Sequence, residues 1–376
     1  MQDWQITNKI TCVVSDNAAN IQAAIRLGEW RPVGCFAHTL NLIVQNGLKV
    51  ISEIVGKVKS IVEYFKKSCT AQTKLESVLK QMGLPILKLK QECPTRWNSC
   101  YEMLERILRV KDAVISTLAL IRNELNLQIA DWEVLETVVA ILKPFFEVTV
   151  EVSSENHVTL SKVLVFTQIM SKHIIKNLAK TYKHPVIPEL LNKLKTQIEA
   201  RLFDLESNIL YADSTILDPR FKQKGFRTQK SYENAIEDIR RRISRIQINS
   251  TVVYENQVCL NTNSAPVDTD SMWADFDTDM NQGVRPENSV AAGIRELDKY
   301  MKEEYLHRKE DPLKWWHSRK HIYPHIYQLV LKRLCIQATS VSCERIFSGA
   351  GQVITNRRKL LKPSKVSQVV FLHSNM

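Results

Sequence analysis

Two acidic side chains have neighbours that are typical of metal-binding sites. Asp16 follows a short β-branched run in "KITCVVSDN", and Glu344 lies among small and apolar residues in "SVSCERIFSGAG". Ligand and metal sites gather at the carboxyl ends of strands in open α/β sheets, so Asp16 is a candidate metal ligand. Ser-Asp-Asn is equally typical of a helix N-cap. Glu344 by itself indicates a surface charge or a partner of Arg345, so any site shared by the two carboxylates has to be built by the fold.

The elements that would position Asp16 are predicted to be α/β. A strand is predicted over 10–14, a helix follows through "NAANIQAAIRLG" to Gly28, and a second strand over 33–36 leads into a helix that carries His38. Apolar residues at three- and four-residue spacing then predict one amphipathic helix over 50–80.

Helical periodicity dominates the rest of the chain. After the loop "KQECPTRWNS" it continues to about residue 246, and it returns at 291. Between these points Asn, Ser, Thr and Asp prevail, as is typical of a solvated connector. Only ten glycines and twelve prolines leave few turns for a β-sandwich or barrel. We therefore predict a mostly α protein with a partial α/β element, in four segments: 1–92, 93–247, an acidic and polar linker over 248–290, and 291–376.

The charge of the chain favours a polyanionic partner. A formal net charge of +12 attracts nucleic acid or an anionic membrane surface. No stretch of about eighteen uncharged apolar residues occurs and the N-terminus does not resemble a signal peptide, which favours an intracellular protein and nucleic acid. The basic run Arg357, Arg358, Lys359, Lys362 and Lys365 could contact phosphates, or could form a solvated helix face.

Cysteine and tryptophan patterns are less specific. The eight cysteines are scattered without a C-x-x-C pair, so reduced thiols are expected. Cys35 and His38 form a lone C-x-x-H, which is half of a zinc site at best. Trp315 and Trp316 could stack on bases, although aromatic residues at helical spacing are more typical of a core or an interface.

Six motifs follow one another along nearly the whole chain: "VVSDNAANI", "VGCFAHTLNLIV", "CPTRWNSCYEMLERIL", "ILDPRFK", "DPLKWW" and "ATSVSCERIFSGAGQVITNRRKLLKPSKVSQVVFLHSN". Their order resembles the transposases of the hobo/Activator (hAT) superfamily, especially animal members with a BED zinc finger. The resemblance implies an RNase H-like fold interrupted by a large helical insertion, with two aspartates and one glutamate around divalent metal ions. Asp16 matches the second aspartate and Glu344 the glutamate. Such metal ions activate a water or a 3′-hydroxyl for in-line attack on a DNA phosphate.

The resemblance also assigns the other candidate residues. Cys35 and His38 match an element that lies near transposon-end DNA in active relatives. The predicted DNA contacts are Cys35, His38, Arg345, Arg357, Arg358, Lys359 and Lys362. The segment from Trp315 to His373 matches the C-terminal hAT dimerisation region. The predicted dimerisation residues are Trp315, Trp316, Leu360, Leu361, Val366, Val369, Val370 and Leu372.

In the family, the first aspartate and the BED finger lie upstream of the segment that Trp4 to Thr7 match. We therefore expect a catalytic remnant that needs no cofactor as given, with Mg²⁺ or Mn²⁺ bound only if a longer product has the complete site. Its expected function is self-association, as a homodimer or a higher oligomer, and DNA or chromatin association in the nucleus, with no membrane partner and no small-molecule substrate. Two alternatives stay open: a fragment of an active cut-and-paste transposase, and an interaction scaffold without DNA contact.

Overall fold

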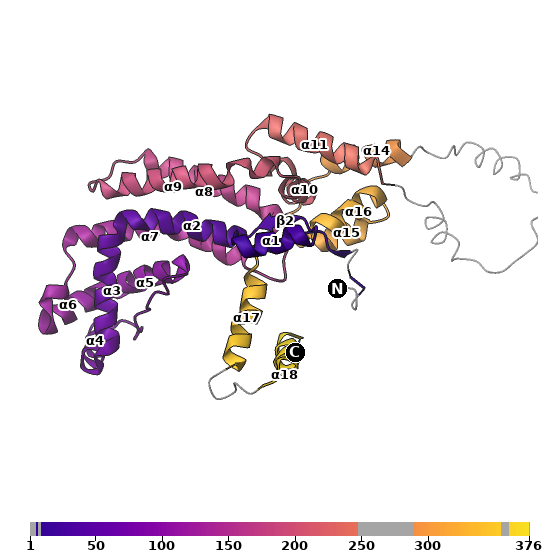
Figure 1. Cartoon of the computed structure of the whole chain (residues 1–376). Coiled ribbons are helices and arrows are strands. Elements are labelled where there is room, and N and C mark those ends of the chain that lie inside the picture. The colour runs from indigo at the N-terminus through magenta and orange to yellow at the C-terminus, as the bar shows by residue number, and fades with distance from the viewer. Residues whose placement is uncertain (1–4, 7–8, 247–288, 355–360, 376) are drawn as a thin grey trace, which may run out of the picture. The chain divides into compact units, whose positions relative to one another are not determined.

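The computed structural model describes residues 5–6, 9–246, 289–354 and 361–375 (Figure 1). The chain divides into two compact units: unit 1 combines Met1–Leu205 with Ile336–Met376, and unit 2 is Glu206–Cys335. Unit 2 therefore joins helices from both sides of the predicted linker, which the four predicted segments had kept apart. Apart from its last two residues, that linker lies outside the described residues.

The predicted α/β element is present in unit 1. Strand β1 (Val13–Ser15) pairs in parallel with β2 (Pro32–Gly34), and Val14 lies opposite Val33. Helix α1 (Ala19–Leu27) joins the two strands and ends at Gly28, as predicted. Both strands are shorter than expected: β1 begins only at Val13, and β2 ends at Gly34 because Phe36 already begins the next helix, α2 (Phe36–Leu48).

The single helix predicted over 50–80 is wrong. The chain forms a short 3-10 turn (Lys49–Ile51) and then two helices, α3 (Ser52–Lys67) and α4 (Cys69–Gln81). Ser68 has an extended backbone between the two helices, and its Oγ accepts a hydrogen bond of 3.2 Å from the backbone N–H of Ala71. The side chain thereby caps α4 and ends the helical run.

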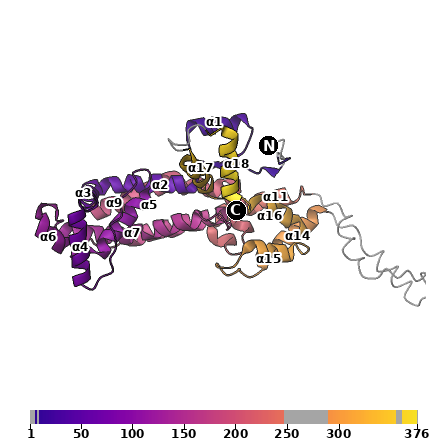
Figure 2. The same ribbon diagram turned by 90° about the horizontal axis from the view of Figure 1, so that it is seen from below.

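Long helices form the rest of the unit 1 body, so the mostly α fold is confirmed. They are α5 (Trp97–Arg109), α6 (Lys111–Ile121), α7 (Ile129–Val152), α8 (Val163–Leu178) and α9 (Val186–Leu202). Helix α9 packs against α2 and α8, and α7 packs against α5 and α8 (Figures 1 and 2). Their shared core is fully buried and includes Leu40, Ile43, Leu104, Leu142 and Leu191.

The last two helices of unit 1 form a hairpin. Helix α17 (Val341–Val353) packs against α18 (Pro363–Asn375). Thr159 ties the chain before α17 to the body, because its Oγ1 accepts from the N–H of Ala338 at 2.9 Å and donates to Oε1 of Gln337 at 2.7 Å. None of the described helices is long and apolar enough to cross a membrane.

Unit 2 is a second helical body. Its helices are α10 (Ile209–Leu217), α11 (Gln229–Ile243), α14 (Ser289–Lys302), α15 (Pro312–Arg319) and α16 (Pro324–Arg333). The fully buried Asp213 pairs with Arg242 at 2.5 Å and with Arg333 at 2.8 Å. The fully buried Lys222 donates to the carbonyls of Tyr300 at 2.8 Å and of Glu303 at 2.5 Å. Both buried charges have the partners that such burial requires.

Candidate functional site

Asp16 follows the last residue of β1, as predicted. Its Oδ1 accepts a hydrogen bond of 3.2 Å from the N–H of Ala18, the residue before α1. The side chain of Gln22 reaches back to the Asp16 carbonyl at 3.1 Å. The carboxylate therefore stabilises the turn that leads into α1, but it does not cap the helix, because Ala18 is itself the N-cap residue and its side chain makes no capping bond.

A buried cysteine links the end of β1 to the start of α17. The N–H of Cys35 donates to the carbonyl of Ser15 at 2.7 Å, and its Sγ accepts from the N–H of Ser340 at 3.4 Å. The next residue, Phe36, donates its N–H to the carbonyl of Ala338 at 2.9 Å. Asp16 follows Ser15 directly, and Glu344 lies one turn beyond Ser340. The fold thus brings the two segments that carry the predicted carboxylates to one corner of unit 1.

Glu344 is exposed in the first turn of α17. Its Oε1 accepts from the hydroxyl of Ser340 at 3.1 Å. Arg345, which the sequence had offered as its partner, instead pairs with Glu155 at 2.5 Å and donates to the carbonyl of Ser153 at 3.3 Å. Glu344 is therefore a solvent-accessible carboxylate without a salt bridge to its neighbour in sequence.

A cleft of about 640 Å³ opens beside Glu344. Its walls come from α2, from the start of α5, from the end of α7 and from α17. The lining residues are Ala37, His38, Asn41, Thr95, Arg96, Trp97, Asn98, Thr149, Val150, Ser153, Val341, Glu344, Arg345, Ser348 and Gly349. The cleft brings together three of the predicted site residues, His38, Glu344 and Arg345. Asp16 is not among its lining residues, and Cys35 lies buried behind it.

Two polar atoms in the cleft wall have no partner in the described part of the chain. Nε1 of Trp97 and Oδ1 of Asn98 are buried and make no hydrogen bond there. The whole Trp97 side chain is buried, with only 3% of the residue exposed. The Trp97 ring is held edge-on against Tyr101 and Phe146, and the backbone N–H of Trp97 donates to Oδ1 of Asn41 at 3.0 Å. Buried polar atoms are nearly always satisfied. The indole N–H and the amide oxygen are enclosed in the wall, so a ligand in the cleft can reach them only after the wall shifts.

Two regions of this chain match models of known protein families. Residues 33–141 match the family model of the ZBED1 RNase-like helical domain, and residues 296–376 match the hAT family C-terminal dimerisation region. These two matches, and relatives named as zinc finger BED proteins and AC transposases, support an hAT-family, ZBED-like protein derived from a transposase. Human zinc finger BED domain-containing protein 4 is 27% identical over 98% of this chain and 31% of its own length. A Zea mays protein named as an AC transposase is also 27% identical, over 98% of this chain and 49% of its own length. Mouse zinc finger BED domain-containing protein 6 is 24% identical over 99% of this chain and 41% of its own length. This hAT chain spans between about a third and a half of the length of these relatives.

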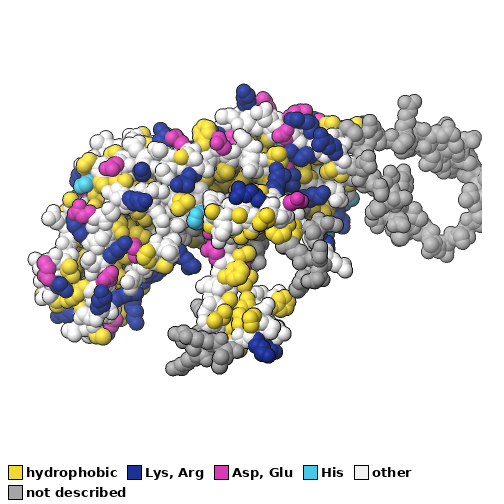
Figure 3. All heavy atoms as spheres, in the orientation of Figure 1, with side chains coloured by type: hydrophobic (Ala, Val, Ile, Leu, Met, Phe, Trp, Pro, Cys, Tyr) yellow, Lys and Arg dark blue, Asp and Glu magenta, His cyan; other side chains and the backbone are white. Residues whose placement is uncertain are grey.

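The hAT dimerisation region exposes apolar side chains on its terminal hairpin (Figure 3). In α17, Phe347 is 75% exposed and Ile346 is 41% exposed. Of the predicted dimerisation residues, Leu361, Val369 and Leu372 are exposed, Val366 and Val370 are half-buried, and Leu360 lies outside the described residues. Exposed apolar faces of this kind are typical of interaction surfaces. The assignment of single residues to a dimer interface stays a prediction.

The predicted tryptophan pair lies in unit 2. Trp316 is fully buried, stands beside Tyr300 and Tyr323, and donates its Nε1–H to the carbonyl of Leu217 at 2.7 Å. Trp315 is half-buried, with the guanidinium of Arg319 over its ring at 4.3 Å. Trp316 is thus a core residue of its own unit, and any effect of it on dimerisation would be indirect.

The predicted basic contacts are only partly described. Arg357, Arg358 and Lys359 lie outside the described residues, and Lys362 is exposed just before α18. His38 lines the cleft, whereas the sulfur of Cys35 is engaged by Ser340. The residues that sequence reasoning did not single out are Arg96, Trp97 and Asn98, although they lie within the quoted "CPTRWNSC" motif.

Divalent metal ions need several ligands at once. Among the residues that the structure describes, no three His, Cys, Asp or Glu side chains gather closely enough to hold a metal ion. Asp16 and Glu344 each make a local hydrogen bond instead. These side chains alone do not assemble a divalent site, and metal binding by them stays a prediction.

Proposed function

We propose that this hAT chain associates with itself through α17 and α18 and binds DNA through the cleft beside α17, acting in the nucleus without cutting DNA by itself. The single observation that carries DNA binding is the pair of buried atoms without partners, Nε1 of Trp97 and Oδ1 of Asn98. They offer one donor and one acceptor, which the polar edge of a base needs, and a small shift of the wall would make both atoms accessible. Self-association is supported by the match to the dimerisation region and by its exposed apolar side chains.

Charge in the same cleft supports a nucleic acid. Arg96 and Arg345 line it, and planar guanidinium groups are well suited to phosphates, but the guanidinium of Arg345 already pairs with Glu155, so Arg96 is the cation of this pair that is available. Arg96 is exposed, and no acidic side chain lies within ion-pair distance of it among the described residues. A nucleotide could therefore place its phosphate on Arg96 and its base against the wall formed by Trp97 and Asn98.

The test is DNA binding by fluorescence anisotropy, measured from 50 to 200 mM salt with labelled single-stranded and duplex DNA. Arg96→Gln should weaken binding about tenfold and reduce the salt slope by about one. Arg109→Gln, at the far end of α5, is the matched control because Arg109 is exposed and pairs only with Glu105 in its own helix. An affinity that does not fall with salt would contradict phosphate contact and favour a scaffold without DNA.

Trp97→Phe gives a sharper test of the cleft. The substitution keeps an aromatic ring and removes only the buried N–H that has no partner, so the fold should lose little stability. DNA binding should nevertheless weaken. Loss of stability with unchanged DNA affinity would show that the indole serves packing alone.

Metal-dependent phosphoryl transfer is the second candidate. It is favoured by the Cys35 junction, which joins the segments of Asp16 and Glu344. The family resemblance implies three carboxylates, and Asp16 and Glu344 are proposed as two of them. Labelled DNA incubated with the chain and Mg²⁺ or Mn²⁺ should stay intact if the proposal is right. Cleavage that disappears in Glu344→Gln would establish the enzyme instead.

A further inference from the structure

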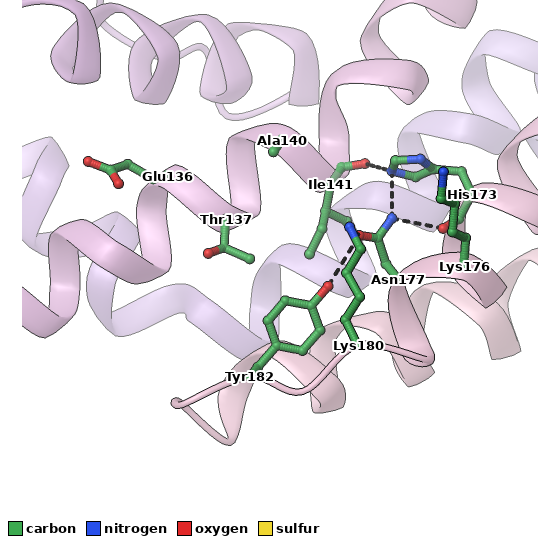
Figure 4. A pocket seen from close by; sticks show the side chains of 9 residues that line it. All are labelled: Glu136, Thr137, Ala140, Ile141, His173, Lys176, Asn177, Lys180 and Tyr182. Carbon is green, nitrogen blue, oxygen red and sulfur yellow. Dashed lines mark hydrogen bonds between the residues drawn. The ribbon is translucent and has the colours of Figure 1, made fainter.

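A second pocket of about 450 Å³ lies between α7, α8 and the chain that follows α8 (Figure 4). It shares no residue with the cleft beside α17. One wall comes from α7 and contributes Glu136, Thr137, Ala140 and Ile141. The other comes from α8 and its continuation and contributes His173, Lys176, Asn177, Lys180 and Tyr182.

A buried amide orders the second wall. Asn177 is only 7% exposed, and its Oδ1 accepts from Nζ of Lys180 at 3.0 Å and from the hydroxyl of Tyr182 at 3.2 Å. Its Nδ2 donates to the carbonyl of His173 at 2.8 Å. Figure 4 shows the lysine and the tyrosine converging on this amide. One of the three N–H groups of Lys180 is used in this bond, so two are left for a ligand.

The pocket carries an excess of positive charge. No acidic side chain lies within ion-pair distance of Lys176 among the described residues, whereas Glu136 pairs with Lys111 at 2.8 Å. Burial lowers the pKa of His173, and the charges of Lys180 and Lys176 lower it further. The neutral ring donates its Nε2–H to the carbonyl of Ile141 at 3.1 Å. The two ammonium groups are therefore the charges that face the cavity without a counter-ion.

Lysines near the end of α8 also complement the helix dipole. That role accounts for their charge but not for the rest of the arrangement. A dipole interaction needs neither the buried amide that holds Lys180 beside Tyr182 nor a hollow between α7 and α8.

We propose that this pocket binds a phosphate group, with Lys176 and Lys180 as its cationic donors. Lysine is a common phosphate ligand and acts as a point charge. The cavity exceeds the size of a phosphate, and the ring of Tyr182 with Ala140 and Ile141 offers an apolar wall for the sugar or base of a nucleotide. The phosphate could belong to a free nucleotide or to a DNA strand. The proposal holds independently of DNA binding in the cleft, because the residues differ.

The experiment uses the whole chain and three probes: inorganic phosphate, a deoxynucleoside monophosphate and a short single-stranded oligonucleotide. Calorimetry should show that Lys176→Gln and Lys180→Gln each weaken binding about tenfold. Lys183→Gln is the matched control, because this exposed lysine pairs with Glu133 and does not line the pocket. Its effect should stay within about twofold, as for other exposed pairs.

NMR titration of the His173 ring supplies a second readout. A bound anion offsets the two lysine charges, so the pKa of His173 should rise when the probe binds. Each lysine variant removes one of the two charges that lower the pKa of His173. Without any probe, that pKa should therefore be higher in each variant than in the wild type. Thermal unfolding of each variant must match that of the wild-type chain.

The outcomes separate the sources of the phosphate. Mononucleotide binding that depends on both lysines supports a nucleotide site, and tighter binding of the oligonucleotide with the same dependence supports a DNA strand. Binding of inorganic phosphate alone supports the anion site without a nucleotide. Equal affinities of wild type and both lysine variants for every probe, or an unmoved pKa of His173, would overturn the proposal. Arg96→Gln should leave mononucleotide binding here unchanged, whatever becomes of the cleft.

Discussion

Replacing Phe347 with serine should weaken self-association of the chain. Phe347 is 75% exposed on α17, beside the 41% exposed Ile346, within the hAT dimerisation region. A large aromatic side chain in water is the kind of residue that anchors an interface. Serine removes the apolar ring, and the exposed position leaves the packing inside the subunit almost unchanged.

The magnitude follows from the area that the ring offers. Phenylalanine contributes about 150–250 Å². Three quarters of this, at ~25 cal/mol per Å², corresponds to about 3–5 kcal/mol for each subunit if the ring is fully covered. Part of that is offset by incomplete burial of the ring and by the rotamer freedom that Phe347 loses at the interface, so about 2 kcal/mol is a realistic effect. The dissociation constant should therefore rise about thirtyfold for each ring that is lost.

The assay is light scattering and sedimentation across micromolar concentrations. Ile129→Ser is the matched control, because Ile129 is 80% exposed at the start of α7, outside the dimerisation region. The wild type and Ile129→Ser should dimerise alike, while Phe347→Ser should be largely monomeric at the same concentration. A wild-type monomer, or equal dissociation constants for all three chains, would refute the reasoning.

Three further predictions concern the fold. Asp213→Asn removes the carboxylate that pairs with the buried Arg333 and the half-buried Arg242 and should cost about 3–5 kcal/mol in urea unfolding, whereas Asp238→Asn, in an exposed pair, should cost at most about 1 kcal/mol. Burial lowers the pKa of Lys222 from 10.5 to about 8, so the unfolded chain binds more protons between these values. Stability should therefore rise with pH across that window, and Lys222→Met should remove this part of the pH dependence; a parallel profile would contradict it. Thr159→Val removes the side-chain bonds to Gln337 and Ala338 and should speed hydrogen exchange at the N–H of Ala338; unchanged exchange would show that these bonds do not hold α17.

The local sequence pattern was sufficient to predict the secondary structure where interactions between neighbouring residues determine it. The β-branched run before Asp16 and the polar residues after it predicted a strand followed by a capped helix. The strand and the helix are present, but Ala18 stands at the N-cap without a side-chain cap, and the Asp16 carboxylate bonds only to the N–H of Ala18 in the turn before the helix. Gly28 stands at the end of the helix as predicted. Its N–H makes a bond to the carbonyl of Ala24, and the apolar periodicity of the helix stops at this residue.

The same reasoning failed where a single side chain overrode a continuing pattern. Apolar residues keep helical spacing on both sides of Ser68, so periodicity alone predicted one helix. The break depends on the Ser68 hydroxyl, which bonds to the N–H of Ala71. A serine inside an amphipathic run is a weak signal, because such residues are also tolerated within helices.

Long-range contacts were beyond any local pattern. Ser340 meets Cys35 although 305 positions separate them, and this contact sets where Glu344 stands. Helical spacing likewise could not tell that Trp316 is buried against Tyr300 and Leu217. The cleft around Trp97 could not be predicted either, since its walls come from four separate parts of the chain, and their contacts do not show in the sequence.

The discontinuous make-up of unit 1 has a consequence for synthesis on the ribosome. Residues 206–335 emerge before 336–376, so unit 2 can complete its fold while unit 1 still lacks its last segment. Until then the N–H of Phe36 and the hydroxyl of Thr159 have no partner from the final stretch. The corner that holds Asp16 and Glu344 can therefore form only after residues 336–376 have emerged. A chain cut before residue 336 would be left with a folded unit 2 and an unfinished cleft, so the order of synthesis separates the folding of the two units.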